Sequence, residues 1–221
     1  NQELIGVLTG QWGDYGMVPR DASFLMHATV VKHYFGGGSY PVGGSWMIPE
    51  TIVPVIRAGG GEVFTYAKVE EIVIEQGRAT GVRMANGDIL RADQIVSSAG
   101  ARVTFEQLLP VALRESLGYP AKLKQVKTSG AHLCIYAGFK GSAAELGLPK
   151  TNLWIYPNEH HEANVAAFQA DVNAPFPMLY VSFPSAKDPE WDSNYPGKST
   201  VEVLTMAPWE WLEKWQDTTW G

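Results

Sequence analysis

The stretch from residue 62 to residue 100, EVFTYAKVEEIVIEQGRATGVRMANGDILRADQIVSSAG, is the most regular part of the chain. Short runs of β-branched residues alternate there with Gln76-Gly77 and Asn86-Gly87, dipeptides that favour the tight turns of β-hairpins. The pattern predicts an antiparallel meander of three strands at residues 68–75, 79–85 and 88–91. One strand at 62–66 precedes the meander, and a buried strand of the parallel type follows it at 94–98.

The residues ahead of this stretch predict helices. Apolar side chains recur at three- and four-residue intervals within residues 1–35, which is typical of two helices. A glycine-rich corner, FGGGSYPVGGSW at 35–46, then leads into a helix over 45–58 that the glycines at 59–61 should end. The glycine spacing matches neither G-x-G-x-x-G nor a P-loop, so the corner is not a phosphate-binding fingerprint.

The last part of the chain predicts a sheet with covering helices. A helix containing Phe105 opens it, and AHLCIYAGF around Cys134 indicates a buried strand in which the lone cysteine is a small core residue. A single cysteine excludes an intrachain disulfide. We expect strands near 131–139, 152–157, 178–184 and 200–206, and helices near 159–170 and 208–216.

Composition narrows the class of protein. The chain has 221 residues, of which 45% are hydrophobic and 18% charged, with a formal net charge of −6. No basic block could follow a phosphate backbone, which argues against nucleic acid and strongly anionic membranes as partners. No run reaches the ~18 apolar residues that a membrane span requires. We expect a cytoplasmic protein, with peripheral membrane contact as an option.

The polar clusters give no metal site or catalytic centre. EHHE at 159–162 gathers four candidate ligands, but adjacent helical residues point in different directions and the HExxH spacing is absent. A solvated, partly acidic helix start is the favoured interpretation. No Ser-His-Asp or paired-carboxylate pattern is recognisable, so we name no catalytic residue.

The order of elements over residues 40–100 resembles the central part of the FAD-dependent amine-oxidase and phytoene-desaturase superfamily. A P-x-GG corner leads into a helix ending in Gly-Gly, followed by a V-x-x-I strand and an A-D-x-I-V strand closed by Ala-Gly. The FEQLLP helix and LYVSFPSAKDPEWDSNYPGKSTVEVLTMAPWEWLEKW make the chain most similar to the retinol saturase and carotenoid isomerase branch. The resemblance covers nearly the whole chain, and PSAKDP…PGKST is its most specific part.

The resemblance implies an α/β fold with an α+β substrate layer. One portion is part of an FAD-binding Rossmann-like domain of the glutathione-reductase and amine-oxidase type, and the other is a mixed-sheet-and-helix substrate domain. We therefore expect three parts. Residues 1–58 form the helical part of the substrate domain, with the glycine-rich corner, and residues 59–100 form the meander and strand of the FAD-binding domain. Residues 101–221 form the substrate-binding domain, a sheet with covering helices.

The resemblance also implies roles for six residues. Val69 stands where a family strand holds the adenine end of FAD through its backbone, and Ser98, Ala99 and Gly100 stand where that domain passes the adenosine and pyrophosphate. Trp46 and Met47 stand beside the substrate cavity, where an aromatic ring and a thioether suit an elongated apolar substrate. An ordinary packing role at the start of a helix explains Trp46 and Met47 equally well.

The function implied is that of an FAD-dependent oxidoreductase acting on carbon–carbon bonds of a long apolar substrate such as a carotenoid or retinoid, by desaturation, saturation or isomerisation. An apolar tunnel between the strands after residue 101 and the helices of 1–35 would hold the substrate. Two alternatives remain: a non-enzymatic module that binds an apolar ligand or a partner, and a flavin amine oxidase.

The chain departs from the family pattern in its cofactor elements. It has no G-x-G-x-x-G with a following acidic residue near its start, and no C-terminal glycine-rich segment that approaches the flavin. We therefore expect a fragment of a flavoprotein that is inactive alone and binds FAD weakly or not at all. No oligomeric state is predicted.

Overall fold

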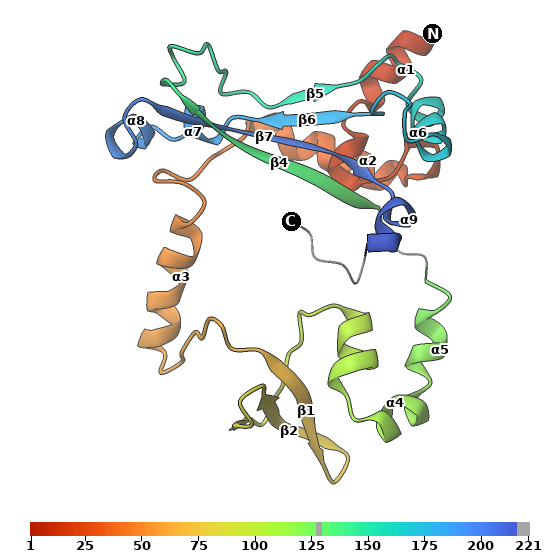
Figure 1. Cartoon of the computed structure of the whole chain (residues 1–221), viewed down its shortest axis with the longest axis vertical. Coiled ribbons are helices and arrows are strands. Elements are labelled where there is room, and N and C mark those ends of the chain that lie inside the picture. The colour runs from red at the N-terminus through yellow and green to blue at the C-terminus, as the bar shows by residue number, and fades with distance from the viewer. Residues whose placement is uncertain (127–129, 216–221) are drawn as a thin grey trace. The chain divides into compact units, whose positions relative to one another are not determined.

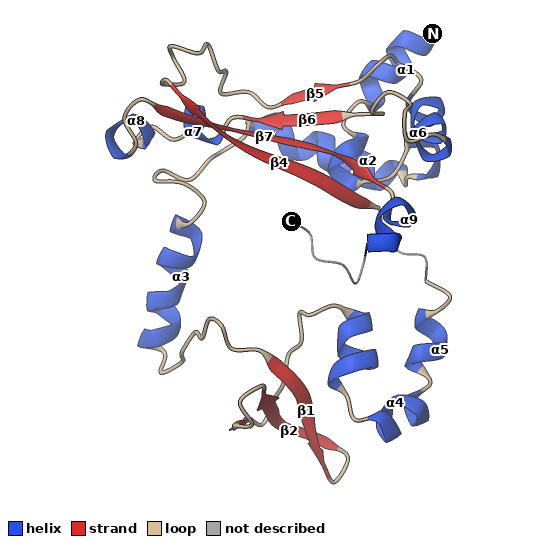
Figure 2. Cartoon of the chain, in the orientation of Figure 1, coloured by secondary structure: helices blue, strands red, loops and turns tan. Residues whose placement is uncertain are grey.

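The chain forms two compact units in a computed structural model that describes residues 1–126 and 130–215. One unit consists of Asn1–Pro54 and Ser129–Gly221, and the other of Val55–Thr128. We call them the sheet unit and the meander unit. Both combine helices with antiparallel strands, so the fold belongs to the mixed α/β class (Figure 2). The division into 1–58, 59–100 and 101–221 stays a prediction.

The sheet unit is built around four strands in the order β4-β7-β6-β5, with antiparallel pairing throughout (Figure 1). The strands are β4 (Ala131–Lys140), β5 (Leu153–Ile155), β6 (Leu179–Ser182) and β7 (Lys198–Ala207). The helices are α1 (Gln2–Thr9), α2 (Phe24–His33), α6 (His161–Ala170), α7 (Pro184–Lys187), α8 (Trp191–Asn194) and α9 (Trp209–Leu212), and α3 (Met47–Ala58) contributes residues to both units. The strands and helices expected from the sequence in these regions are confirmed over the described residues. The helix expected at 208–216 is α9 followed by a 3-10 turn at Glu213–Trp215, and residue 216 lies outside the described residues.

Local signals explain where the first helices begin and end. The Asn1 side chain accepts a hydrogen bond from the Leu4 amide at 3.2 Å, which caps α1. The helix α3 keeps Pro54 in its interior and ends at the glycines, where Gly60 has φ +82°. None of the helices in the described residues is both long and apolar enough to cross a membrane.

The core of the sheet unit lies between the sheet and the N-terminal segment. Trp12, which is 1% exposed, packs with Val165 and Met178, and Trp154 and Met206 pack against this cluster. These residues come from a 3-10 turn, from α6, from the strands β5 and β7 and from the residue before β6. The N-terminal segment therefore covers one face of the sheet.

The meander unit holds a three-stranded antiparallel sheet in the order β1-β2-β3. Gln76 and Gly77, with φ +49° and +77°, form the tight turn between the first two strands. A Cβ on Gly81 would come within 2.4 Å of the Leu90 carbonyl oxygen, so this strand pair requires glycine there. The elements are β1 (Val69–Glu75), β2 (Arg78–Met84), β3 (Ile89–Arg91), a π-helix at Val103–Leu108, α4 (Val111–Leu117) and α5 (Tyr119–Leu123).

Two expected strands are absent from the described residues. The segments 62–66 and 94–98 have irregular backbone, and Val96 is almost fully exposed. A strand needs a neighbour to satisfy its N–H and C=O groups. The ladders of the meander end at β1 and β3, so neither segment has a partner and both predictions are wrong. The three predicted strands of the meander itself are confirmed.

Candidate functional site

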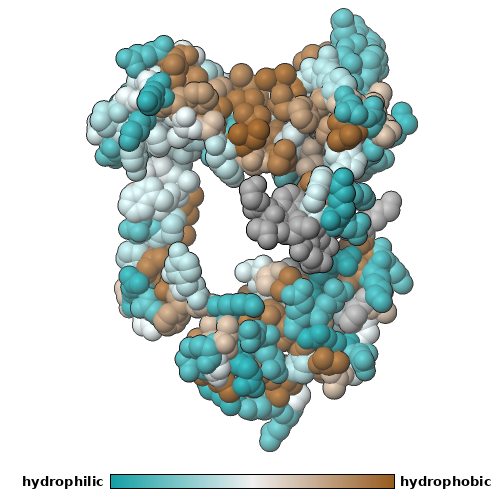
Figure 3. All heavy atoms as spheres, in the orientation of Figure 1, coloured by the Kyte–Doolittle hydropathy of each residue, from teal (hydrophilic) through white to brown (hydrophobic). Residues whose placement is uncertain are grey.

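Within the part of the chain that the structure describes, one face of the four-stranded sheet is apolar and uncovered. Residues directly opposite each other in an antiparallel ladder point to the same side, and Ile135, Val203, Val181 and Leu153 form one such row across the sheet. Ile135 is 57% exposed, and Leu133 on the same side of β4 is 52% exposed. We call the side that carries this row the bare face. Figure 3 shows apolar side chains gathered over the strands.

The exposure of β4 corrects the expectation that AHLCIYAGF is a buried strand. The strand exists, but Leu133, Ile135 and Phe139 are all exposed, and Cys134 is half-buried on the opposite side. An apolar strand sequence predicts a place in the core because apolar side chains are usually buried. Here the apolar residues form a surface instead.

The opposite face of the sheet packs against the N-terminal segment. Cys134, Leu204, Tyr180 and Trp154 form the row that runs parallel to the bare one. Trp154 packs against the Trp12 cluster, and its ring centroid lies 4.8 Å from that of Tyr180. A pocket of about 360 Å³ opens between the N-terminal segment and this face, and Gly6, Val7 and Trp154 are among its lining residues. The tunnel expected there therefore stays a prediction. A broader apolar surface lies on the other side of the strands.

The glycine-rich corner is held by a buried carboxylate. Asp188, only 7% exposed, accepts hydrogen bonds through Oδ1 from the amides of Gly43 at 2.9 Å and Glu190 at 3.0 Å. Gly43 and Gly44 have φ +84° and +94°, values that favour glycine. Asp188 belongs to the PSAKDP stretch, so one hydrogen bond joins the glycine-rich corner to the most specific part of the resemblance.

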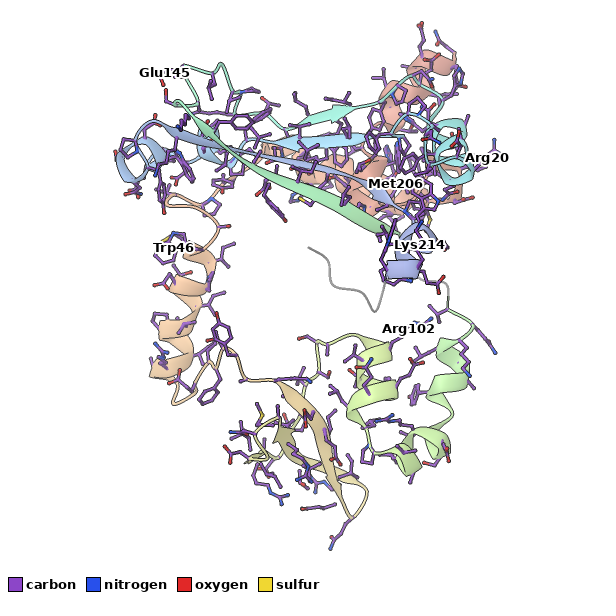
Figure 4. The ribbon with its side chains drawn as sticks, in the orientation of Figure 1. Arg20, Trp46, Arg102, Glu145, Met206 and Lys214 are labelled. Atoms are coloured by element: carbon purple, nitrogen blue, oxygen red, sulfur yellow. The ribbon has the colours of Figure 1, made fainter. Side chains whose placement is uncertain are left out.

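The corner forms one wall of a pocket of about 360 Å³, which we call the corner pocket. Trp46 lines it, and the Trp46 Nε1–H donates to the Gly43 carbonyl oxygen at 2.7 Å. Figure 4 shows Trp46 at the start of α3. Met47 packs close to Gly43 instead of lining the pocket. The substrate-binding role of Trp46 and Met47 remains a prediction.

Aromatic rings and one carboxylate dominate the rest of the corner pocket. Tyr40, Tyr136, Trp191 and Tyr195 line it together with Glu202. Burial raises the pKa of the Tyr40 hydroxyl, and the negative charges of Glu202 and Asp188 raise it further. Sequence analysis missed both carboxylates, because Glu202 is one polar residue in an apolar strand and Asp188 meets the corner across 145 positions of chain.

Val69 lies at the open edge of the meander. The Ala85 amide donates to the Lys68 carbonyl oxygen at 2.9 Å, and Val69 stands opposite Met84. This pattern makes Val69 and Met84 a non-hydrogen-bonded pair, whose backbone groups point away from each other. Because β1 is the first strand of its sheet, the N–H and C=O of Val69 point outward. A backbone contact to the adenine end of FAD fits this geometry.

Ser98, Ala99 and Gly100 form an exposed turn ahead of the π-helix. Gly100 has φ +87°, and a Cβ there would meet nothing within 4 Å, so the space beside the turn is open. The Gly100 carbonyl oxygen accepts from the Thr104 amide at 3.0 Å, which anchors the turn to the helix. An open, fixed backbone segment suits the close approach of a nucleotide, and the role of these three residues stays a prediction.

The EHHE stretch is structural in part. His160 is exposed and Glu159 is half-buried, but His161 is only 3% exposed, and its Nε2 lies 3.0 Å from the Gly6 carbonyl oxygen. The solvated, partly acidic helix start that the sequence favours is therefore wrong for His161, whose ring bonds α6 to α1. Across residues 1–126 and 130–215, no group of three or more His, Cys, Asp or Glu side chains could hold a metal ion.

Comparison with known proteins supports the resemblance. The chain is 34% identical over 225 residues to an all-trans-retinol 13,14-reductase from Danio rerio, a match covering 98% of this chain and 37% of the relative. It is 31% identical to a neurosporene-forming phytoene desaturase from Cereibacter sphaeroides, covering 79% of this chain and 35% of that protein. No protein-family model matches the chain.

A solved structure shares the fold. An oxidoreductase from Methanosarcina mazei superposes with a TM-score of 0.64 at 20% sequence identity, over 96% of this chain and 45% of that one. The chain therefore belongs to the retinol saturase and phytoene desaturase family. It spans little more than a third of the length of the curated relatives it matches.

Proposed function

We propose that the protein is an FAD-dependent oxidoreductase that acts on carbon–carbon bonds of a long apolar polyene, by desaturation, saturation or isomerisation. The observation that carries the proposal is the bare face: an uncovered apolar surface in a chain similar to proteins named for retinol and phytoene. A retinoid or a carotenoid offers a conjugated apolar chain that can lie along such a surface.

The bare face supplies binding energy without a polar anchor. Leu133 and Ile135 on β4 and Leu153 and Ile155 on β5 are each between 40% and 57% exposed. Full burial of a large aliphatic side chain is worth roughly 1.5–3 kcal/mol, so covering several half-exposed ones favours an elongated apolar ligand. Because area burial is non-directional, the face orients the polyene by its shape.

The proposed cofactor contacts would fall in the meander unit. FAD, when bound, supplies the transfer of hydride or electrons, and the protein supplies binding and orientation. The outward backbone groups of Val69 would hold the adenine end, and the open turn at Ser98, Ala99 and Gly100 would border the adenosine and pyrophosphate. No side chain of this chain is assigned a proton-transfer role.

An absorption spectrum tests the cofactor part of the proposal. The protein is expressed from its complete gene, purified without added cofactor and scanned for the bands of oxidised flavin. We expect bound flavin that bleaches under dithionite and is reoxidised or reduced when a polyene such as all-trans-retinol is added without oxygen. A protein that holds no flavin even after reconstitution with FAD would contradict the proposal and favour a non-enzymatic module that binds apolar ligands.

A further inference from the structure

We propose that the corner pocket binds a small organic cation, such as the ammonium group of an amine. This site is separate from the bare face, and the inference does not depend on the proposed polyene chemistry. Its volume of about 360 Å³ falls within the range of about 300–1,000 Å³ that is typical of small-molecule sites.

The walls of the corner pocket are aromatic on several sides. Tyr40 and Trp46 come from the glycine-rich corner, Tyr136 comes from β4, and Trp191 and Tyr195 come from α8 and the residue after it. The rings of Trp191 and Tyr195 have centroids 4.6 Å apart. The faces of aromatic rings carry partial negative charge and attract cations, which is how aromatic cages bind ammonium groups.

Glu202 gives the pocket a carboxylate without a direct hydrogen-bond or ion-pair partner among the described residues. It lines the pocket from β7, is half-buried, and makes no hydrogen bond or ion pair with the residues that the structure describes. A carboxylate removed from water without a partner is costly. A bound cation would supply that partner.

The neighbouring charges do not neutralise Glu202 inside the pocket. Asp188 is occupied by the amides of Gly43 and Glu190. Lys187 attracts Glu202 electrostatically, and its Nζ lies 5.7 Å from the centroid of the Tyr40 ring. It donates to Ser182 Oγ at 2.6 Å and to the Asn152 side chain, and it lies outside the set of lining residues. None of the lining residues is Lys, Arg or His. Five aromatic rings and one carboxylate without a lining base favour a cation over an anion or a neutral ligand.

A pair of probes that differ in charge tests the site. Benzylammonium and benzyl alcohol have the same ring and nearly the same size, and their binding to the protein can be measured by calorimetry and by tryptophan fluorescence. We expect benzylammonium to bind at least about tenfold more tightly, which corresponds to about 1.4 kcal/mol. Glu202→Gln should remove this preference and leave the weak binding of the alcohol unchanged.

Two further variants test whether the preference for benzylammonium comes from the corner pocket or from a general change in the protein's charge. Glu210→Gln removes an exposed carboxylate on α9 and should change neither affinity. Tyr136→Leu removes one ring from a residue that is 76% exposed, so the fold should tolerate it while benzylammonium binding weakens severalfold. Equal binding of the two probes, binding of neither, or a preference that survives Glu202→Gln would overturn the proposal.

Discussion

The two faces of the four-stranded sheet carry parallel apolar rows in different surroundings. On the covered face, Trp154 packs against the cluster of Trp12 and Met178, where Trp12 is 1% exposed. On the bare face, Ile135 in the neighbouring row is 57% exposed. The comparison teaches that one face holds the unit together, and that the other is available for an apolar ligand.

The largest expected effect belongs to the covered face. Trp12→Ala should lower the free energy of unfolding by about 3–5 kcal/mol, because it empties a fully packed site. Phe24→Ala, at an 82% exposed position on α2, should stay within about 0.5 kcal/mol. Urea denaturation of both variants measures the difference. Similar losses would mean that the Trp12 cluster is not the core of the unit.

The carboxylate that holds the corner comes next. Asp188→Ala removes the acceptor of two part-buried hydrogen bonds, from the amides of Gly43 and Glu190, which should cost about 1–3 kcal/mol of unfolding free energy. Asp188→Asn keeps one acceptor oxygen of nearly the same size, so it should cost less than alanine. The same denaturation assay applies. Equal costs for the two variants would show that the hydrogen bonds at Oδ1 do not hold the corner.

The comparison extends to the meander, where the open side is a strand edge. Val69→Pro removes an N–H that points away from β2, so the sheet should tolerate the substitution. The affinity for FAD should fall about tenfold, which is the equivalent of about one lost hydrogen bond. Val69→Ala keeps the N–H and should retain flavin. Flavin content after dialysis reports the result. Full retention by the proline variant would remove Val69 from the cofactor site.

The smallest effect on stability is expected on the bare face. Ile135→Asp exchanges a half-exposed apolar side chain for a charged one, and the free energy of unfolding should change by no more than about 0.5 kcal/mol. Leu204→Asp, in the adjacent row on the covered side, should be markedly destabilising. If the two substitutions lower the free energy of unfolding equally, the bare face and the covered face do not differ in their contribution to stability.

The sequence predicts those parts of the fold that depend on local signals. Gln76-Gly77 and Asn86-Gly87 mark the turns of the meander, and the strands β4 and β7 follow from apolar runs. The strand predictions at 62–66 and 94–98 are wrong because a strand depends on its neighbours as well as on its own residues. Local patterns cannot supply that information.

The site was harder to predict because its parts are distant in sequence. Trp46 was singled out from the resemblance, but the contact between Asp188 and Gly43 and the exposure of Ile135 depend on tertiary packing. An apolar strand has the same sequence whether a core or a ligand covers it. Glu202 could have been noticed as the one acidic residue within the strand β7.

The most direct test of the account is a titration of the protein with a polyene, followed by the quenching of tryptophan fluorescence, for three forms. Ile135→Asp alters the bare face, and Leu8→Asp places the same charge at a 63% exposed apolar position on α1. We predict that the unaltered protein and Leu8→Asp bind with equal affinity and that Ile135→Asp binds at least about tenfold more weakly, or about 1.4 kcal/mol. Equal binding by all three forms would contradict the assignment of the bare face as the polyene site.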